Sequence, residues 1–167
     1  MTSTPHDHTD QPDQARVVDL MREDRFCMLT SVGPDGRLHS HPMTPQEVTD
    51  EGDVWFFIDA TSGQAANITS EKRVNLAFSD GSTWISVAGH GRLHDDRAKI
   101  EELWNPMVAA WFPDGKDSPE VRLLEVESDS AEYWDTPGGR VASALAFVKT
   151  RITGDRPDVG ESGTVTL

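Results

Sequence analysis

The chain has a single cysteine, few basic residues and no long hydrophobic run, and each shortage excludes something. Because Cys27 is the only cysteine among 167 residues, no intrachain disulfide can form, which is typical of proteins in a reducing cytoplasm. Only 15 Lys and Arg accompany 29 Asp and Glu, for a formal net charge of −14. Nucleic acids and anionic membrane surfaces would repel such a protein, so we expect neither as a partner.

No apolar run approaches the length needed to cross a membrane. The first residues, MTSTPHDHTDQPDQ, lack the basic start and apolar stretch of a secretory signal, so we expect a cytoplasmic protein. The length suits one domain. We expect a disordered polar tail over residues 1–12, a folded domain over 13–160 and a C-terminal tail over 161–167.

Short apolar segments separated by turn residues dominate the chain. The clearest turn is Gly33-Pro34-Asp35-Gly36, which predicts a hairpin. We expect strands over 25–32, 37–44, 53–59, 73–79, 83–93, 121–126 and 131–134. We expect helices from residue 13, from a cap at Thr61 through Ile68, and over 141–150.

These elements define the fold class. Six or seven strands joined mostly by tight turns favour antiparallel pairing, because parallel strands need long crossovers. A closed or nearly closed barrel is favoured over an open sheet, because closure removes exposed edges. The sequence therefore predicts a mainly β protein, an antiparallel six- to seven-stranded barrel with short peripheral helices.

The segment 83–115 is the most distinctive part of the chain. Gly89 and Gly91 suggest a break in its strand, and a short helix carrying Trp104 follows. An apolar piece then ends at Trp111 and Phe112. Such an aromatic arm is suited to covering a flat ligand or a partner subunit.

Two polar segments are candidate binding sites. His39, His41 and Met43 share one strand face, which is either the solvated face of a hairpin or the wall of a ligand site, with Pro42 removing a ladder donor.

The second candidate lies where a strand ends and a helix begins. Thr61, Ser62 and Gln64 there could cradle a phosphate with free N–H groups and hydroxyls. The alternative is an ordinary helix N-cap, which needs only Thr61.

The sequence offers little evidence for other catalytic chemistry. His39 with His41, or His90 with His94, could ligate metal, but no Cys or HExxH motif joins them, so hydrogen-bonded surface histidines fit better. Cys27 sits in an apolar strand, typical of an inert thiol. The sequence has no nucleophile elbow, so the catalytic residues are unknown. The histidine pairs alone do not make us expect a metal site.

Several segments, in order, resemble a known family: GRLHSHPMT (36–44), DVWFFIDATSGQAANI (53–68), RVNLAFSD (73–80), WISVAGHGRLHDD (84–96), KIEELWNPMVAAWFPDG (99–115) and AEYWD (131–135). The chain resembles the pyridoxamine 5′-phosphate oxidase-like FMN-binding split barrels, most closely the general stress protein 26 branch. The resemblance implies a homodimer with flavin in clefts at the subunit interface. Residues 13–160 would then be an FMN-binding split-barrel domain.

The resemblance also implies a site and an activity. Its cofactor-binding residues would be His41, Pro42, Met43, Thr44, Phe57, Ile58, Asp59, Thr61, Ser62, Gln64 and Trp111. FMN is the expected cofactor, with FAD, haem or no cofactor as alternatives. The expected activity is NAD(P)H-linked oxidoreduction of an unknown small molecule. The alternative is flavin binding or a stress-response role without turnover.

Two residues depart from the resembling sequences. Many of those carry Arg where this chain has His41 and Lys where it has Gln64. Losing two charge-assisted phosphate contacts would weaken FMN binding by about a hundredfold or more. Lys72 and Arg73 lie nearby in sequence and could substitute for the lost charges.

Overall fold

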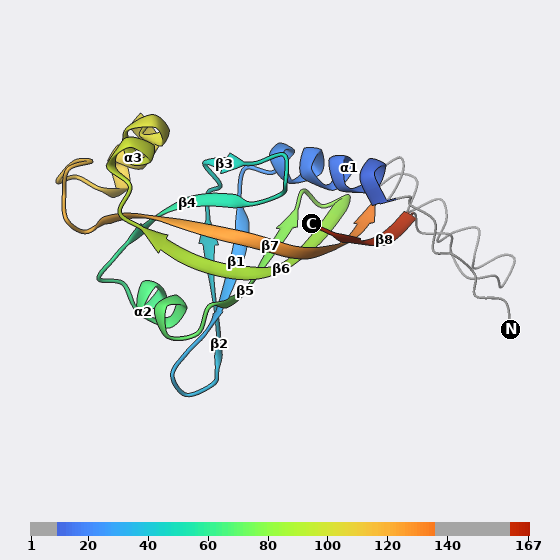
Figure 1. Cartoon of the computed structure of the whole chain (residues 1–167), viewed down its shortest axis with the longest axis horizontal. Helices are drawn as coiled ribbons and strands as arrows, with labels where there is room; N and C mark the ends of the chain where they lie inside the picture. Colours follow the sequence, from blue (N-terminus) through green and yellow to red (C-terminus); the bar gives the residue numbers. More distant parts are fainter. Residues whose placement is uncertain (1–9, 136–160) are drawn as a thin grey trace, which may run out of the picture.

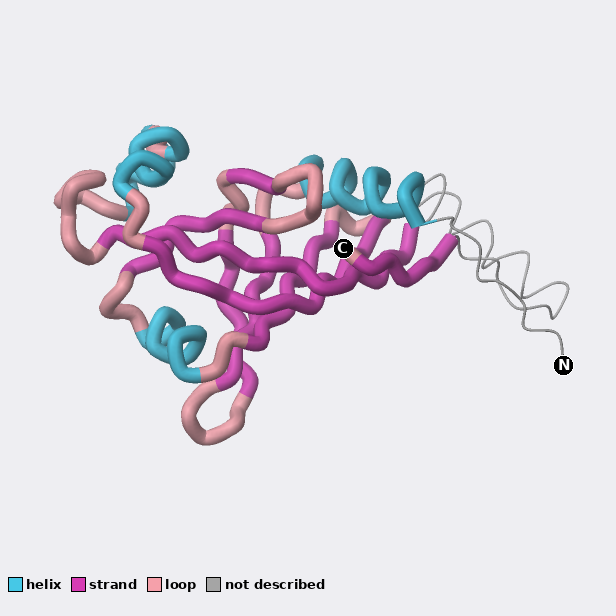
Figure 2. Tube along the Cα trace, in the orientation of Figure 1, coloured by secondary structure: helices cyan, strands magenta, loops and turns pink. Residues whose placement is uncertain are grey.

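The computed structural model describes residues 10–135 and 161–167 (Figure 1). The strands are β1 (Cys27–Val32), β2 (Leu38–Met43), β3 (Glu47–Val48), β4 (Val54–Asp59), β5 (Arg73–Ser79), β6 (Thr83–His94), β7 (Val121–Asp135) and β8 (Glu161–Thr166). The helices are α1 (Asp10–Glu23), α2 (Gly63–Ser70), α3 (Arg97–Leu103) and α4 (Pro106–Trp111). Figure 2 shows the helices at the margins of a curved set of strands.

The strands form one antiparallel sheet in the order β2-β1-β5-β6-β7-β4-β3, and β8 pairs with β7. This confirms the predicted fold class, a mainly β antiparallel split barrel with short helices. The path of strands does not close, because β2 and the β3–β4 pair lie at its two ends without pairing to each other. The short connection through Thr44 and Gln46 spans that split.

Several predicted boundaries were wrong. The C-terminal segment is not a tail, because Glu161–Thr166 pairs with β7 and supplies the eighth strand. Helix α1 begins at Asp10, within the segment expected to be disordered. The two short strands expected over 121–126 and 131–134 are one strand, β7. The helix expected over 141–150 lies outside the described residues.

The predicted break in β6 is also wrong, since the strand runs through both glycines. Gly89 lies at a bulge, where the register with β7 shifts, and a Cβ there would approach the Glu127 carbonyl oxygen to 2.3 Å. A Cβ at Gly91 would lie 2.7 Å from the Ile68 side chain of α2. The glycines therefore allow close contact with β7 and α2 without ending the strand.

Alternating apolar residues build the main core. In β4 and β5 every second side chain is buried, and Phe56, Leu76 and Phe78 are almost completely buried. Helix α1 closes the core with Val17 and Met21. None of the helices among the described residues is both long and apolar enough to cross a membrane.

Candidate functional site

A pocket of about 460 Å³ lies where the path of strands fails to close. It is lined from β2 and the following connection, the end of β4, the start of α2, and α4. Its residues are Pro42, Met43, Thr44, Gln46, Phe57, Ile58, Asp59, Ser62, Gln64, Met107, Val108, Trp111 and Phe112. The volume falls within the range of pockets that hold cofactors and other small ligands.

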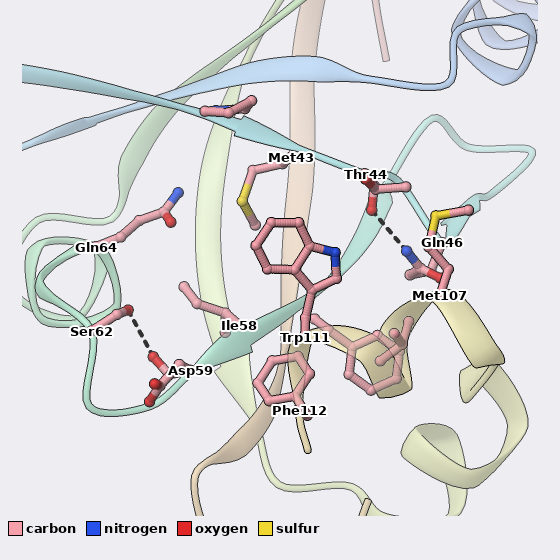
Figure 3. A pocket seen from close by; sticks show the side chains of 13 residues that line it. Met43, Thr44, Gln46, Ile58, Asp59, Ser62, Gln64, Met107, Trp111 and Phe112 are labelled. Carbon is pink, nitrogen blue, oxygen red and sulfur yellow. Dashed lines mark hydrogen bonds between the residues drawn. The ribbon is translucent and has the colours of Figure 1, made fainter. Parts of the chain in front are cut away.

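The pocket has an apolar interior with aromatic rings on the side of α4. Met43 and Ile58 approach the indole of Trp111 from β2 and β4, with Phe112 beside it (Figure 3). Trp111 is nevertheless 80% exposed, so most of its ring is available for contact. A flat ligand could lie against it.

A chain of hydrogen bonds holds α4 near β2. The Gln46 amide donates to the Thr44 carbonyl at 3.0 Å and accepts a 2.8 Å bond from the Asn105 amide. Asn105 also caps α4, because its side-chain oxygen accepts from the N–H groups of Met107 and Val108. Asn105 thus caps the start of α4 and fixes this helix to the opposite wall of the pocket through Gln46.

The start of α2 differs from the sequence prediction. The N-cap is Ser62, not Thr61, since the Ser62 hydroxyl accepts from Ala65 N–H and donates to the Asp59 carbonyl. Thr61 instead donates both its hydroxyl and its N–H to Asp59 Oδ1, each at 2.7 Å. Led by the hydroxyl, these bonds hold the pKa of Asp59 below its ordinary value. Thr61 lines no pocket described here.

Gln64 is the most informative polar residue in the pocket. Its Nε2 atom is buried and has no hydrogen-bond partner among the described residues. The side chain extends from α2 toward the pocket in Figure 3. Leaving a buried amide donor unpaired costs about 1–3 kcal/mol, so an acceptor placed in the pocket would relieve this cost.

A second pocket of about 620 Å³ adjoins the first and shares Ser62 and Gln64 with it. It lies between the β1–β2 hairpin and α2. Its residues are Pro34, Asp35, His39, His41, Ser62, Gly63, Gln64 and Asn67.

Neither pocket is lined by a Lys or Arg from the described residues. Lys72 and Arg73, which we expected to replace the lost phosphate-binding charges, are in the wrong position to do so. Both follow the C-terminal end of α2. That end is about 12 Å from Gly63 at the usual helical rise. Arg73 is moreover paired with Glu71, with Nη2 2.8 Å from Oε2.

The structure brings nine of the eleven predicted site residues together in the first pocket. They are Pro42, Met43, Thr44, Phe57, Ile58, Asp59, Ser62, Gln64 and Trp111. His41 lines the second pocket, and Thr61 lines neither. Their cofactor contacts stay predictions.

Four residues that line the first pocket were not among the predicted cofactor-binding residues, although Phe112 was part of the predicted aromatic arm. These are Gln46, Met107, Val108 and Phe112. The Asn105-Pro106 pair, a helix-start signal, could have placed the two residues of α4.

The other two histidines of the described residues, His90 and His94, are paired with carboxylates. His90 Nδ1 lies 2.9 Å from Asp129, and His94 Nε2 lies 2.7 Å from Glu125. No group of three potential metal ligands occurs among the described residues. Cys27 is buried, and that burial, with a smaller effect of Asp24, raises its pKa to about 12. This thiol is therefore a poor nucleophile.

Comparison with known proteins decides the family. The model of the pyridoxamine 5′-phosphate oxidase-like family matches residues 12–158. The chain belongs to this family. The match confirms the resemblance carried by the sequence segments, and it covers nearly the whole region described here.

Individual proteins that are similar to this chain support the same family. Protein bli-3 of Neurospora crassa is 28% identical over 87% of this chain and 77% of its own length. A structure described as general stress protein 26 from Jannaschia sp. CCS1 is 28% identical, with a TM-score of 0.73, covering 96% of this chain and 100% of that one. A general stress FMN/FAD binding protein from Xanthomonas citri is 35% identical, with a TM-score of 0.63, covering 73% and 87%.

Proposed function

We propose that this protein binds FMN in the first pocket and acts as a flavin-dependent oxidoreductase of the general stress protein 26 type. The observation that carries the proposal is an apolar pocket of about 460 Å³ with an exposed Trp111 ring and the unpartnered amide of Gln64. The Xanthomonas citri relative, described as an FMN/FAD binding protein, supports a flavin as the ligand.

The residues fit the two ends of a flavin unequally. The ring would lie against the apolar wall formed by Met43, Ile58 and Trp111. Among the described strands β2 pairs with β1 alone, so backbone groups on its other edge could bind the polar edge of the ring. The phosphate end would meet Ser62 and Gln64, which offer neutral donors only.

A bound flavin supplies the redox chemistry, while the protein holds and orients it. The arm carrying Trp111 would exclude water from the ring. Among the described residues lining the first pocket, Asp59 is the sole titratable one, and its hydrogen bonds from Thr61 hold its pKa below the ordinary value. Because a flavin carries the redox step itself, this lining is compatible both with an oxidoreductase and with the second candidate, flavin binding without turnover.

We also propose that two copies assemble, with flavins at their interface. Met28, Trp84 and Trp134 are exposed on the outer face of the sheet, and the register pairs the two tryptophans. Covering them would bury an apolar patch. Light scattering should give twice the 18.4 kDa chain mass. A mass of 18.4 kDa at micromolar concentration would contradict the assembly.

The binding proposal is tested by the absorption spectrum of the purified protein and by titration with FMN, riboflavin and FAD. We expect flavin binding that weakens about tenfold in Trp111→Ala, because one aromatic stack contributes up to about 1.5 kcal/mol. Leu38→Ala, a change at an exposed residue lining neither pocket, should leave affinity unchanged. Failure of all three flavins to bind at tens of micromolar, or a haem Soret band, would overturn the proposal.

Turnover is tested separately. Anaerobic mixing of the flavin-loaded protein with NADH or NADPH should bleach the flavin absorbance if the protein is an oxidoreductase using these donors. Stable oxidised flavin under both donors would leave the binding role and remove this activity.

A further inference from the structure

Helix α4 forms one wall of the first pocket but is weakly enclosed itself. Of its six residues, all within the described part of the chain, Val108 alone is buried, while Met107 and Trp111 are exposed beside the pocket (Figure 3). The helix packs outside the main core cluster. Elements with so few buried contacts open at lower free energy than the core. The contacts that hold α4 therefore decide how easily the pocket opens.

The chain is non-helical on both sides of α4. Before the helix, Trp104 and Asn105 are extended, with ψ angles of 132° and 166°. Pro106 has no N–H and cannot continue the hydrogen-bond ladder of α3. After the helix, Gly115 turns the chain at a φ of +85°, which other residues rarely adopt. Residues 105–115, which we call the gate, are thus joined to the rest of the chain by two non-helical links.

The segments beyond both links are fixed to each other and to the barrel. Arg97 of α3 donates to the carbonyls of Lys116 and Ser118 at 3.2 and 3.4 Å, so it holds the chain that follows the gate. Lys99 of α3 lies 2.5 Å from Glu47 of β3, which holds the helix to the sheet. Because these contacts do not include the gate, it can move while α3 and the barrel keep their places.

Asn105 joins the gate to the barrel with a side chain that makes four hydrogen bonds. Its Oδ1 accepts from the N–H groups of Met107 and Val108, which fixes the direction of the amide. Its Nδ2 therefore faces the other way and donates to the Leu103 carbonyl at 3.1 Å and to Gln46 Oε1 at 2.8 Å. Of these four bonds, the one to Gln46 crosses from the gate to the opposite wall of the pocket.

Gln46 is itself held in place by two hydrogen bonds. Its side-chain amide donates to the Thr44 carbonyl at 3.0 Å, and its backbone N–H donates to the Trp55 carbonyl of β4 at 2.8 Å. The side chain therefore extends from a fixed strand end toward Asn105. Both Gln46 and Asn105 are half-buried, so water can take over their hydrogen bonds when the gate opens. Opening then loses one ordinary hydrogen bond and few buried contacts.

We propose that Gln46 is a positioning residue: through its hydrogen bond to Asn105 it holds the gate, and Trp111 with it, closed over the first pocket. A ligand enters and leaves when this bond breaks. The inference rests on the proposed function in its choice of a flavin as the ligand, whereas the gate and its hydrogen bond belong to the chain itself.

Gating has a kinetic signature that the loss of a ligand contact does not have. Removing a contact made only in the bound state raises the dissociation rate and leaves the association rate unchanged. Loosening a gate raises both rates, because entry and exit pass through the same open state. The affinity then changes less than either rate.

The test is stopped-flow fluorescence with riboflavin, which avoids any effect on a phosphate contact. Gln46→Ala should raise the association and dissociation rate constants by about three- to tenfold, as expected from one ordinary hydrogen bond. Asn105→Asp keeps the oxygen that caps α4 but has no donor for Gln46, so it should have the same effect. The double variant should add no further change, because both substitutions break one bond.

Gln14→Ala is the matched control, since the Gln14 amide donates to the Glu51 carbonyl and lines neither pocket. It should leave both rate constants unchanged. A change confined to the dissociation rate, or a double variant whose effect is the sum of the two single ones, would overturn the inference.

Hydrogen exchange of the flavin-free protein separates the inference from the proposed function. In Gln46→Ala, exchange should accelerate at the amides of Ala109 and Phe112, which donate to the Asn105 and Val108 carbonyls along α4. Unchanged exchange in β5 shows that the barrel is intact. If no flavin binds but exchange in α4 accelerates, the gate stands and the flavin proposal fails. If flavins bind but exchange in α4 does not change, the reverse holds.

Discussion

The two faces of β4 differ in what covers them. Val54, Phe56 and Ile58 point into the main core and are almost completely buried. Trp55 and Phe57 point to the other side and are only half-buried. One strand therefore contributes to a closed core on one face and to an open aromatic cluster on the other.

The outer cluster is held by the arm of α3 and α4. The rings of Phe57 and Trp104 meet edge to face at 5.6 Å, and Phe112 lies 6.3 Å from Trp104. Lys99 of α3 lies over Trp55 and places its ammonium 2.5 Å from Glu47. These contacts join the arm to β3 and β4, but the arm has few fully buried residues of its own.

The difference separates stability from binding. Inner-face residues are enclosed by several strands and α1, so they determine whether the barrel folds. Outer-face residues position α4, and with it Trp111, over the pocket. Regions with few buried contacts open at lower free energy than the core, which is common where ligands enter.

The largest expected effect comes from the inner face. Phe56→Ala should lower the free energy of unfolding by about 3–5 kcal/mol, because it removes a fully buried ring and leaves a cavity. Chemical denaturation measures the loss, with exposed Leu38→Ala as the control expected to change little. A loss below about 1 kcal/mol would mean that Phe56 is not part of a closed core.

A smaller effect is expected on the outer face. Trp104→Ala should cost about 2 kcal/mol, because Trp104 is only partly buried. Hydrogen exchange should accelerate in α4 far more than in β5, which serves as the internal control, and flavin affinity should fall. Equal acceleration in both elements would show that the arm and barrel open as one unit.

The strand was readable from the sequence, but which of its faces is buried was not. The two-residue period of a strand says that Val54, Phe56 and Ile58 share one face and Trp55 and Phe57 the other, but all five are apolar, so the pattern does not say which face is enclosed. Alternation cannot tell what covers Trp55 and Phe57. The aromatic arm was recognised, but its attachment through Asn105 and Gln46 depends on a contact across 59 residues.

The errors at the start of α2 and at Gly89 also arose because contacts beyond the local sequence decide these features. Thr61 and Ser62 both have the chemistry of an N-cap, and local sequence does not decide between them. Asp59 does, because it accepts both donors of Thr61 and leaves Ser62 to cap the helix. Gly89 was misread because a glycine required by close packing looks like a strand break in sequence.

The polar end of the pocket should respond to added charge. Gln64→Lys should tighten FMN binding by about 1–2 kcal/mol, or about five- to thirtyfold, by replacing a neutral donor with a cation. Riboflavin should gain almost nothing, which distinguishes a phosphate contact from an effect on the fold. Asn67→Lys, further along α2 in the second pocket, shows whether the charge must stand at residue 64. Equal gains for both flavins would place the phosphate elsewhere.

The smallest expected effect is at Asp59, the last residue of β4, which lines the first pocket. Thr61→Val removes the hydroxyl that chiefly holds the Asp59 pKa down and keeps the backbone N–H bond, so the pKa should rise toward its ordinary value of about 3.9.

This change in pKa also affects stability. A carboxyl whose pKa is lowered in the folded state stabilises the fold at pH values above its unfolded-state pKa, and this contribution is lost as the pH falls through its folded-state pKa. Wild type should therefore be slightly more stable than the variant at pH 7, with the difference shrinking as the pH falls below the ordinary Asp value of about 3.9. Titration of the Asp59 carboxyl by nuclear magnetic resonance measures the shift directly, and Asp80, whose pKa is lowered by Ser82 and Thr83, is the control that should not move. An unchanged Asp59 pKa would mean that the N–H of Thr61 alone orients this carboxylate, leaving the hydroxyl free for a ligand.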